Sequence, residues 1–177
     1  MATSESFKIL GYGHTGITVR SIKDSIRFWN EILGLPVLFQ ATLTGVGTTT
    51  IPGAPAGSAV HIAFIGLPQT PHAGGVTGNI SQLELVQFEL PENVSQEEKS
   101  RTPNSRSWDV GATHIAFFVE GLDQVVEKVK QEKWGLVGGV YTMGEVDPPP
   151  IRGQRVCYIR GPDGETVELI ELPKKEA

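Results

Sequence analysis

The sequence predicts an α+β fold built from two tandem copies of one βαβββ module, and two observations lead to this prediction. GHTGITVRSIKDSIRFWNEILGL (13–35) and THIAFFVEGLDQVVEKVKQEKWGL (113–136) both pass from an apolar, β-branched run into a segment with helical spacing of apolar residues. QLELVQF (82–88) and TVELIEL (166–172) each place a glutamate within an apolar strand. Because the first segments of the two copies match and their last segments also match, the chain contains a duplicated module.

Each copy contains one amphipathic helix. Its apolar face is formed by Ile22, Ile26, Trp29 and Leu33 in the first copy, and by Leu122, Val125, Val126 and Val129 in the second. Ser21 followed by Asp24 is a capping-box pattern with Asp in place of the usual Glu, and Gly34 and Gly135 are typical helix stops. These signals predict helices directly after the first strand of each copy.

The remaining elements complete the two modules. Further strands are expected near 37–43, 58–65 and 154–160, a Gly/Pro-rich loop at 67–79, and a polar, turn-rich linker between the copies. We therefore divide the chain into a first module (1–90), a linker (91–111), a second module (112–172) and a tail (173–177), together forming one domain.

Composition excludes several classes of function. The 177 residues carry a net charge of −5 with scattered cations, which argues against nucleic acid as a partner. No apolar stretch approaches the ~20 residues that span a bilayer, and MATSESFKIL lacks the pattern of a secretory signal, so we expect a cytoplasmic protein without a membrane partner. The single cysteine, Cys157, lies in the strand-like RVCYIRG, where a buried, inert thiol is expected.

Four ionisable residues occupy matching places in the two copies: His14, Glu84, His114 and Glu168. Taken singly, each has a structural explanation, because a histidine often begins a strand and a glutamate between leucines usually marks a solvent face. If a pseudo-twofold axis relates the modules, however, all four side chains can meet at one point. Two imidazoles and two carboxylates suit a divalent first-row metal, whose charge the carboxylates balance. The repeat therefore predicts a metal site.

The chain resembles the vicinal oxygen chelate superfamily, which includes glyoxalase I, methylmalonyl-CoA epimerase, extradiol dioxygenases and fosfomycin-resistance enzymes. The segments that carry the resemblance are GHTGITVRSIKDSIRFWNEILGL, LELVQF, GATHIAFFVEGLDQVVEKV and GPDGETVELIE. It implies paired modules that form a cupped mixed sheet around a metal, with His14, Glu84, His114 and Glu168 as the ligands. It also implies one divalent ion, whose identity (Ni, Co, Zn, Mn or Fe) the sequence leaves open, and a homodimer whose site is either intrachain or shared.

A ligand at position 84 favours the isomerase and lyase branch of the superfamily. The resemblance to glyoxalase I implies proton abstraction next to a carbonyl, an enediolate or enolate stabilised by the metal, and Glu84 or Glu168 as the base. The second catalytic glutamate of methylmalonyl-CoA epimerases has no counterpart, because residues 40–83 contain no Asp, Glu, Lys or Arg. His61 is a further candidate base if its strand lines the cup; otherwise it is an edge-strand histidine.

The uncharged stretch also bears on the substrate. It offers no cation to clamp glutathione or coenzyme A, which favours a small or largely apolar molecule with adjacent oxygen atoms. Two alternatives to the isomerase remain open from sequence. One is an iron-dependent dioxygenase or ring-cleavage enzyme at the same site, and the other is a metal-free small-molecule binding (resistance) protein.

Overall fold

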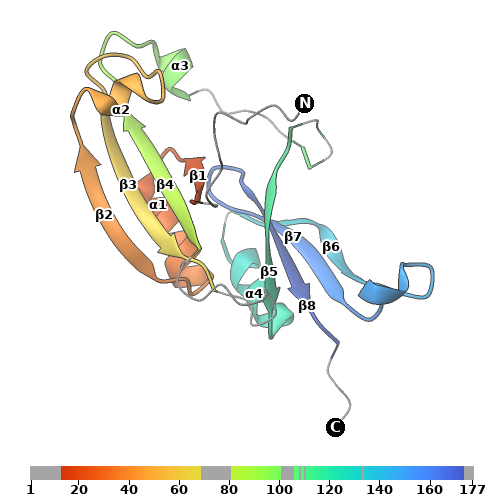
Figure 1. Ribbon diagram of the computed structural model, residues 1–177. Coiled ribbons are helices and arrows are strands. Elements are labelled where there is room, and N and C mark those ends of the chain that lie inside the picture. The colour runs from red at the N-terminus through yellow and green to blue at the C-terminus, as the bar shows by residue number, and fades with distance from the viewer. Residues whose placement is uncertain are drawn as a thin grey trace, which may run out of the picture.

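The computed structural model describes residues 13–68, 81–100, 106–107, 109, 111–132 and 134–173, and it contains two similar modules, each with a four-stranded sheet (Figure 1). The first module consists of β1 (Thr15–Thr18), α1 (Ile22–Ile26), η1 (Arg27–Ile32), β2 (Val37–Leu43), α2 (Gly47–Thr50), β3 (Ala59–Gly66) and β4 (Gln82–Glu89). After α3 (Gln96–Ser100) in the expected linker, the second consists of β5 (His114–Val119), α4 (Leu122–Lys130), β6 (Leu136–Thr142), η2 (Pro149–Ile151), β7 (Arg155–Arg160) and β8 (Thr166–Glu171).

The two sheets have the same topology. Their strand orders are β1-β4-β3-β2 and β5-β8-β7-β6, and the first strand of each module pairs in parallel with the last. The other neighbours are antiparallel. The predicted α+β fold of two βαβββ modules is therefore confirmed, although the described strands form two separate sheets and not one continuous sheet.

The first helix begins as predicted and then changes type. The Ser21 side chain accepts a hydrogen bond from the Asp24 N–H at 3.2 Å, which satisfies one of the free donors of the first turn. From Arg27 the backbone continues as a π-helix, in which the Leu33 N–H donates to the Phe28 carbonyl at 3.1 Å. In this wider turn the consecutive side chains of Phe28 and Trp29 are both fully buried.

The second helix takes its N-terminal cap from a distant strand. Gly121 occupies the N-cap position with φ +77° and has no side chain to offer. The Glu171 carboxylate at the end of β8 instead accepts hydrogen bonds from the N–H groups of Gly121 and Leu122, at 2.9 and 3.0 Å. These N–H groups and the Arg155 guanidinium hold the pKa of Glu171 below its usual value. The helix is thus tied directly to the strand that also carries Glu168.

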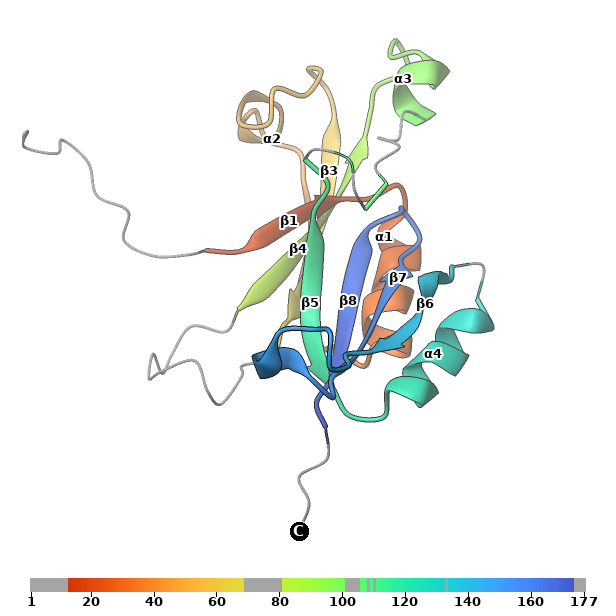
Figure 2. The same ribbon diagram turned by 90° about the vertical axis from the view of Figure 1, so that its right-hand side faces the viewer.

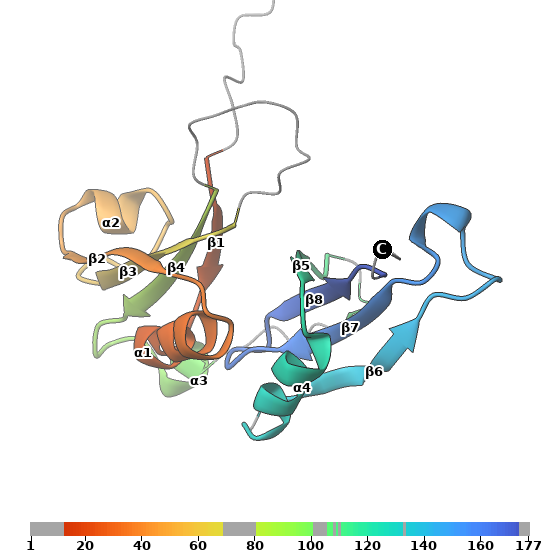
Figure 3. The ribbon, with the colours of Figure 1, turned by 90° about the horizontal axis from the view of Figure 1, so that it is seen from below.

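The modules contact each other through the faces of their sheets that helices cover. Phe28 packs edge-on against Trp134 of the second module, with ring centroids 5.2 Å apart, and Trp29 lies 6.4 Å from Phe117 of β5. The buried side chains of both modules form one hydrophobic core around these rings. Figure 2 shows the second sheet in front of α1, and Figure 3 shows α4 between the second sheet and the first module.

Ion pairs add to this contact. The Arg27 guanidinium donates to both carboxylate oxygens of Glu132, at 2.7 Å for the Nη1–Oε2 pair, and this lowers the pKa of Glu132. Arg20, directly after β1, donates to Asp163 in the loop before β8 at 2.8 Å. Both pairs join residues of different modules, so they favour one relative orientation of the two sheets.

Two further predictions concern burial and membranes. Cys157 lies in β7 and is 3% exposed, and burial raises the pKa of its thiol, as expected for an inert cysteine. Among the described residues, no helix is both long and apolar enough to cross a bilayer.

Candidate metal centre

His14 and Glu84 meet on the open face of the first sheet. Leu83 and Leu85 are fully buried on the helix-covered face, so strand alternation turns Glu84 to the other side. Glu84 pairs in register with Gly16 of β1, which brings it beside His14 just before that strand. The His14 Nε2 atom lies 3.0 Å from the Glu84 Oε2 atom, with the side chains 45% and 20% exposed.

The second module repeats this arrangement. Val167 and Leu169 are buried beneath the second sheet, so Glu168 faces the open side. Glu168 pairs with Ala116, two residues beyond His114 on the same face of β5. The His114 Nε2 atom lies 3.2 Å from the Glu168 Oε2 atom, with exposed fractions of 45% and 19%. The duplication therefore extends to the geometry and exposure of the two His–Glu pairs.

The spacing of each pair fits two adjacent ligands of one metal ion. Nitrogen and oxygen ligands lie ~2.1 Å from such an ion, so two ligands at a right angle are separated by about 3.0 Å. A first-row ion needs roughly four or more donors, and imidazole with carboxylate is a suitable set. Each pair supplies two of these donors.

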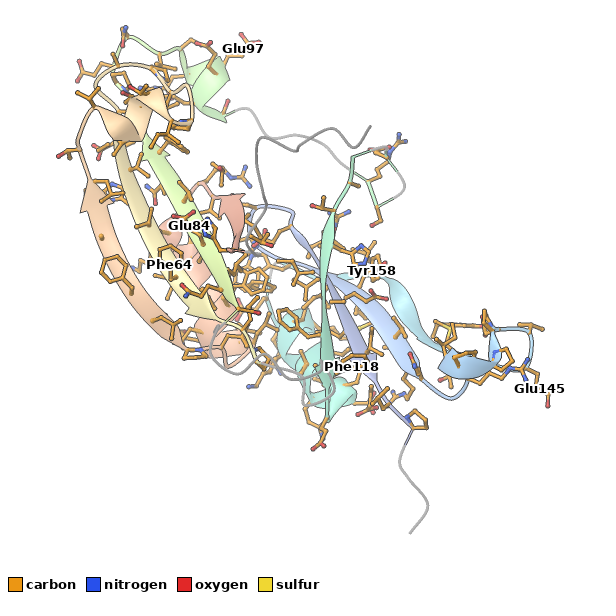
Figure 4. The ribbon with its side chains drawn as sticks, viewed as in Figure 1. Phe64, Glu84, Glu97, Phe118, Glu145 and Tyr158 are labelled. Atoms are coloured by element: carbon orange, nitrogen blue, oxygen red, sulfur yellow. The ribbon has the colours of Figure 1, made fainter. Side chains whose placement is uncertain are left out.

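The two pairs do not meet within one chain. The part of the chain that the structure describes contains no group of three or more His, Cys, Asp or Glu side chains placed to hold one ion. The reason is the direction in which the sheets face. Phe117 of β5 packs towards Trp29 of the first module, and His114, three positions away, therefore points to the opposite side. In Figure 4, Glu84 and Tyr158, the strand neighbour of Glu168, lie on different sheets.

The family model described as the Glyoxalase/Bleomycin resistance protein/Dioxygenase superfamily matches residues 11–169. The chain belongs to this superfamily.

Proteins similar to this chain include an epimerase, a glyoxalase family protein and a fosfomycin resistance protein. A 2-epi-5-epi-valiolone epimerase from an Actinomyces species is 24% identical over 165 residues, which cover 90% of this chain and 78% of the epimerase. A glyoxalase family protein from Bacillus cereus superimposes with a TM-score of 0.69 at 26% identity, covering 98% of this chain and 100% of that one. FosX from Listeria monocytogenes, a fosfomycin resistance protein crystallised with Mn(II) and sulfate, shares the fold at a TM-score of 0.52 and 15% identity over 93% of each chain.

Aromatic residues lie next to both His–Glu pairs of this glyoxalase-superfamily chain, and no sequence motif marked them as part of the site. Phe39, Phe64 and Glu84 are consecutive register partners on β2, β3 and β4, and the His14 ring meets Phe64 edge-on at 5.7 Å. In the second module the register partner of Glu168 is Tyr158, whose ring lies 5.3 Å from that of His114. One pair is thus flanked by phenyl rings and the other by a phenol.

His61 lies on the face opposite to Glu84. Phe64 shares the face of Glu84, and His61 is three positions away on the same strand, so it points towards the helix-covered side. There its Nδ1 atom lies 2.9 Å from the Thr42 Oγ1 atom, and its Nε2 atom lies 3.4 Å from the Glu89 Oε2 atom. Of the two alternatives for His61, the structure therefore does not support the one in which it faces the cup, and its role as the base stays an untested prediction.

A cavity of about 600 Å³ lies between β1, the start of β5 and the loop before β8. Of the four candidate ligands in the described chain, His114 alone contributes to its lining, together with Thr113, Asp163 and Glu165. This cavity therefore does not bring the two His–Glu pairs together.

Proposed function

We propose that this protein is a metal-dependent isomerase or epimerase that abstracts a proton from a carbon next to a carbonyl group. The observation that carries the proposal is the repeated His–Glu pair, with donor atoms 3.0 and 3.2 Å apart at matching places of two modules. The resemblance of the chain to an epimerase, at 24% identity, supports the same class of reaction.

His14 and Glu84 of one copy, with His114 and Glu168 of a second copy in a homodimer, would hold one divalent ion (Ni, Co, Zn, Mn or Fe), because the two pairs do not meet within one chain. When bound, such an ion supplies Lewis acidity that stabilises negative charge on a substrate oxygen. The two carboxylates offset the charge of the ion, and both sit on open sheet faces where a small substrate can approach. Imidazole rings packed against Phe64 and Tyr158 are restrained in orientation, which keeps their Nε2 atoms directed at the ion site.

Proton transfer falls to one of the two carboxylates. A carboxylate within reach of the carbon takes the proton as general base and returns it to the other side of the same carbon or to its neighbour. Replacement of Glu84 or Glu168 by Gln keeps a side-chain oxygen but removes the base. The variant that retains the ion and loses turnover identifies the proton carrier.

The sheet face around Glu84 indicates the kind of substrate. Phe39 and Phe64 line it, and residues 40–83 supply no charged side chain. On the second sheet Tyr158 is the register partner of Glu168, and its hydroxyl can donate a hydrogen bond to a substrate oxygen. We therefore propose a small molecule with two adjacent oxygen atoms on an uncharged, largely apolar body.

Two measurements test the proposal. Elemental analysis of protein purified without a metal-affinity tag should give about one divalent ion per chain. Incubation with α-hydroxycarbonyl compounds in deuterated water should then exchange the carbon-bound proton next to the carbonyl, seen by NMR. Iron accompanied by oxygen consumption would overturn the proposal in favour of a dioxygenase, and failure to bind any of the five candidate ions would leave a metal-free binding protein.

A further inference from the structure

We infer that residues 44–58, the segment that carries α2, form a cover that closes over the His14–Glu84 pair and selects ligands with a bulky apolar body. Val46 and Ile51 are the side chains to which we assign this selection. The inference rests on the proposed function, which places a ligand with two adjacent oxygen atoms at this pair. We call residues 44–58 the α2 cover.

The first step is that the open face of the first sheet is unequally covered. Three rows of register partners cross this face on β2, β3 and β4: Leu43–Val60–Phe88, Ala41–Ile62–Val86 and Phe39–Phe64–Glu84. On the central strand β3, Val60 is 5% exposed and Ile62 is 9% exposed, whereas Phe64 is only partly buried. One end of the open face is therefore covered, and the cover stops at the row that contains Glu84.

The second step identifies α2 as the element over this end. The chain leaves β2 after Leu43 and enters β3 at Ala59, so both ends of the α2 cover lie at the first of the three rows. In Figure 3, α2 lies on the side of this sheet opposite to α1. Strand residues advance by ~3.4 Å each, so Phe64 lies about 7 Å beyond Ile62. The uncovered row therefore begins about one side-chain length from the α2 cover.

The third step is that the α2 cover holds its shape by itself. The Ala54 N–H donates to the Thr49 carbonyl at 2.9 Å, and the Ser58 hydroxyl donates to the Pro55 carbonyl at 2.8 Å. Within the described chain, the hydrogen bonds made by residues 45–57 all have their partners inside the α2 cover. Apolar contact alone therefore sets its distance from the sheet, and it can close on a ligand as a unit.

The fourth step concerns the chemistry of the α2 cover. It contains no charged side chain, and the two residues that flank α2, Val46 and Ile51, are 82% and 89% exposed. Single exposed apolar residues are common on proteins. These two, however, adjoin a face that carries Phe39 and Phe64 beside Glu84, and small-molecule sites combine apolar walls with a few polar groups. A ligand with an aryl or alicyclic body would bury both side chains, whereas one with a methyl group in that place would leave them in water.

Two hydroxamates test this selection, because each offers two adjacent oxygens to an ion and neither has to be turned over. Acetohydroxamate carries a methyl group and benzohydroxamate a phenyl ring. Their affinities for the Ni-loaded protein are measured by isothermal titration calorimetry. The double variant Val46→Ser, Ile51→Ser should bind benzohydroxamate about tenfold more weakly than the wild type, the effect of losing roughly 60 Å² of apolar contact. Its affinity for acetohydroxamate should be unchanged.

Val146→Ser is the matched control. Val146 is 92% exposed between β6 and β7 of the second module, so the same kind of substitution there should change neither affinity. Both variants should have the unfolding midpoint of the wild type in urea, because the substituted side chains are exposed. A loss of affinity confined to the double variant and to benzohydroxamate is therefore an effect of the α2 cover.

Hydrogen exchange measures the closure directly. Benzohydroxamate should slow amide exchange within residues 47–54 of the wild type and should slow it less in the double variant. Equal benzohydroxamate affinity of wild type and double variant would overturn the inference and leave the proposed function intact, as would exchange that benzohydroxamate does not alter. A wild-type protein that takes up no ion would instead remove the proposed function, and the inference with it.

Discussion

Glu171 provides a test of how the second module is held together. Its carboxylate at the end of β8 caps α4 through the N–H groups of Gly121 and Leu122, and it also accepts from Arg155 at 2.8 Å. Glu171→Gln keeps the shape but removes the charge. Loss of a helix cap costs about 0.5–2 kcal/mol, and the amide oxygen still accepts one N–H, so we expect a loss of about 1 kcal/mol in the free energy of unfolding at pH 7.

The effect has a defined pH dependence. The native contacts lower the pKa of Glu171 from its ordinary value of 4.5, so its contribution is complete above pH 4.5 and is lost as the pH falls through the native pKa. The difference between wild type and variant should therefore shrink towards zero in acid. With an m-value of about 2 kcal/mol per molar urea, the unfolding midpoint should fall by about 0.5 M at pH 7.

Urea unfolding followed by circular dichroism at pH 7 and at a pH below 4 measures this difference. Glu92→Gln, at an exposed position in a turn, is the matched control and should leave the midpoint unchanged at both values. A variant as stable as the wild type at pH 7 would refute the capping role. A loss that persists undiminished in acid would show that packing, and not the charge, is responsible.

Three further predictions concern the core, the site and the thiol. Trp29→Ala, at a fully buried position between the modules, should cost about 3–5 kcal/mol in urea unfolding, and a loss below about 1 kcal/mol would contradict its central place in the core. Tyr158→Phe should leave metal content unchanged while raising KM or lowering kcat, because only the hydroxyl offered to the substrate is removed; unchanged kinetics would argue against that contact. Cys157 should react with thiol reagents only at the rate of unfolding, so fast labelling of the native protein would be inconsistent with its burial and raised pKa.

The strands and helices of the two modules could be predicted from sequence, because the spacing of apolar residues along the chain determines them. The expected strand at 37–43 matches β2, and the one at 58–65 differs from β3 by a single position at each end. The π-helical turn was not predicted, because Ile22, Ile26, Trp29 and Leu33 also fit an ordinary α-helix. Phe28 and Trp29 are both fully buried, and adjacent apolar residues also occur on the buried face of an ordinary α-helix, so no pattern in the sequence identifies the π-helical turn.

Features that depend on distant pairing were beyond sequence reasoning. The cap on α4 comes from Glu171, about fifty residues away, and no local pattern identifies it. The face of His61 depends on the register between β3 and β4, which aligns Phe64 with Glu84. The pattern of apolar residues does not fix this register, and a shift by one residue would have turned His61 to the other side.

The sequence names the members of the candidate site, and their role as metal ligands stays a prediction. Duplication alone selects His14, Glu84, His114 and Glu168, and strand register joins each histidine to its own glutamate. Whether the two pairs face each other is decided by how the modules pack, and that depends on side chains such as Trp134 that no repeat identifies. Whether the site is intrachain or shared between two chains was therefore left open by the sequence.

The two His–Glu pairs also differ in the residue next to the glutamate, and this difference bears on catalysis. Their distances and exposures nearly coincide, yet Glu84 has Phe64 as its strand neighbour and Glu168 has Tyr158. The proposed centre, which contains both His–Glu pairs, would have an apolar wall on one side of the ion and a hydroxyl-bearing wall on the other. We expect the proposed substrate, with an apolar body and two adjacent oxygens, to place its oxygens towards Tyr158. In that orientation the carbon-bound proton faces Glu84, so Glu84→Gln is expected to lower turnover more than Glu168→Gln, and the reverse order would assign the base to Glu168.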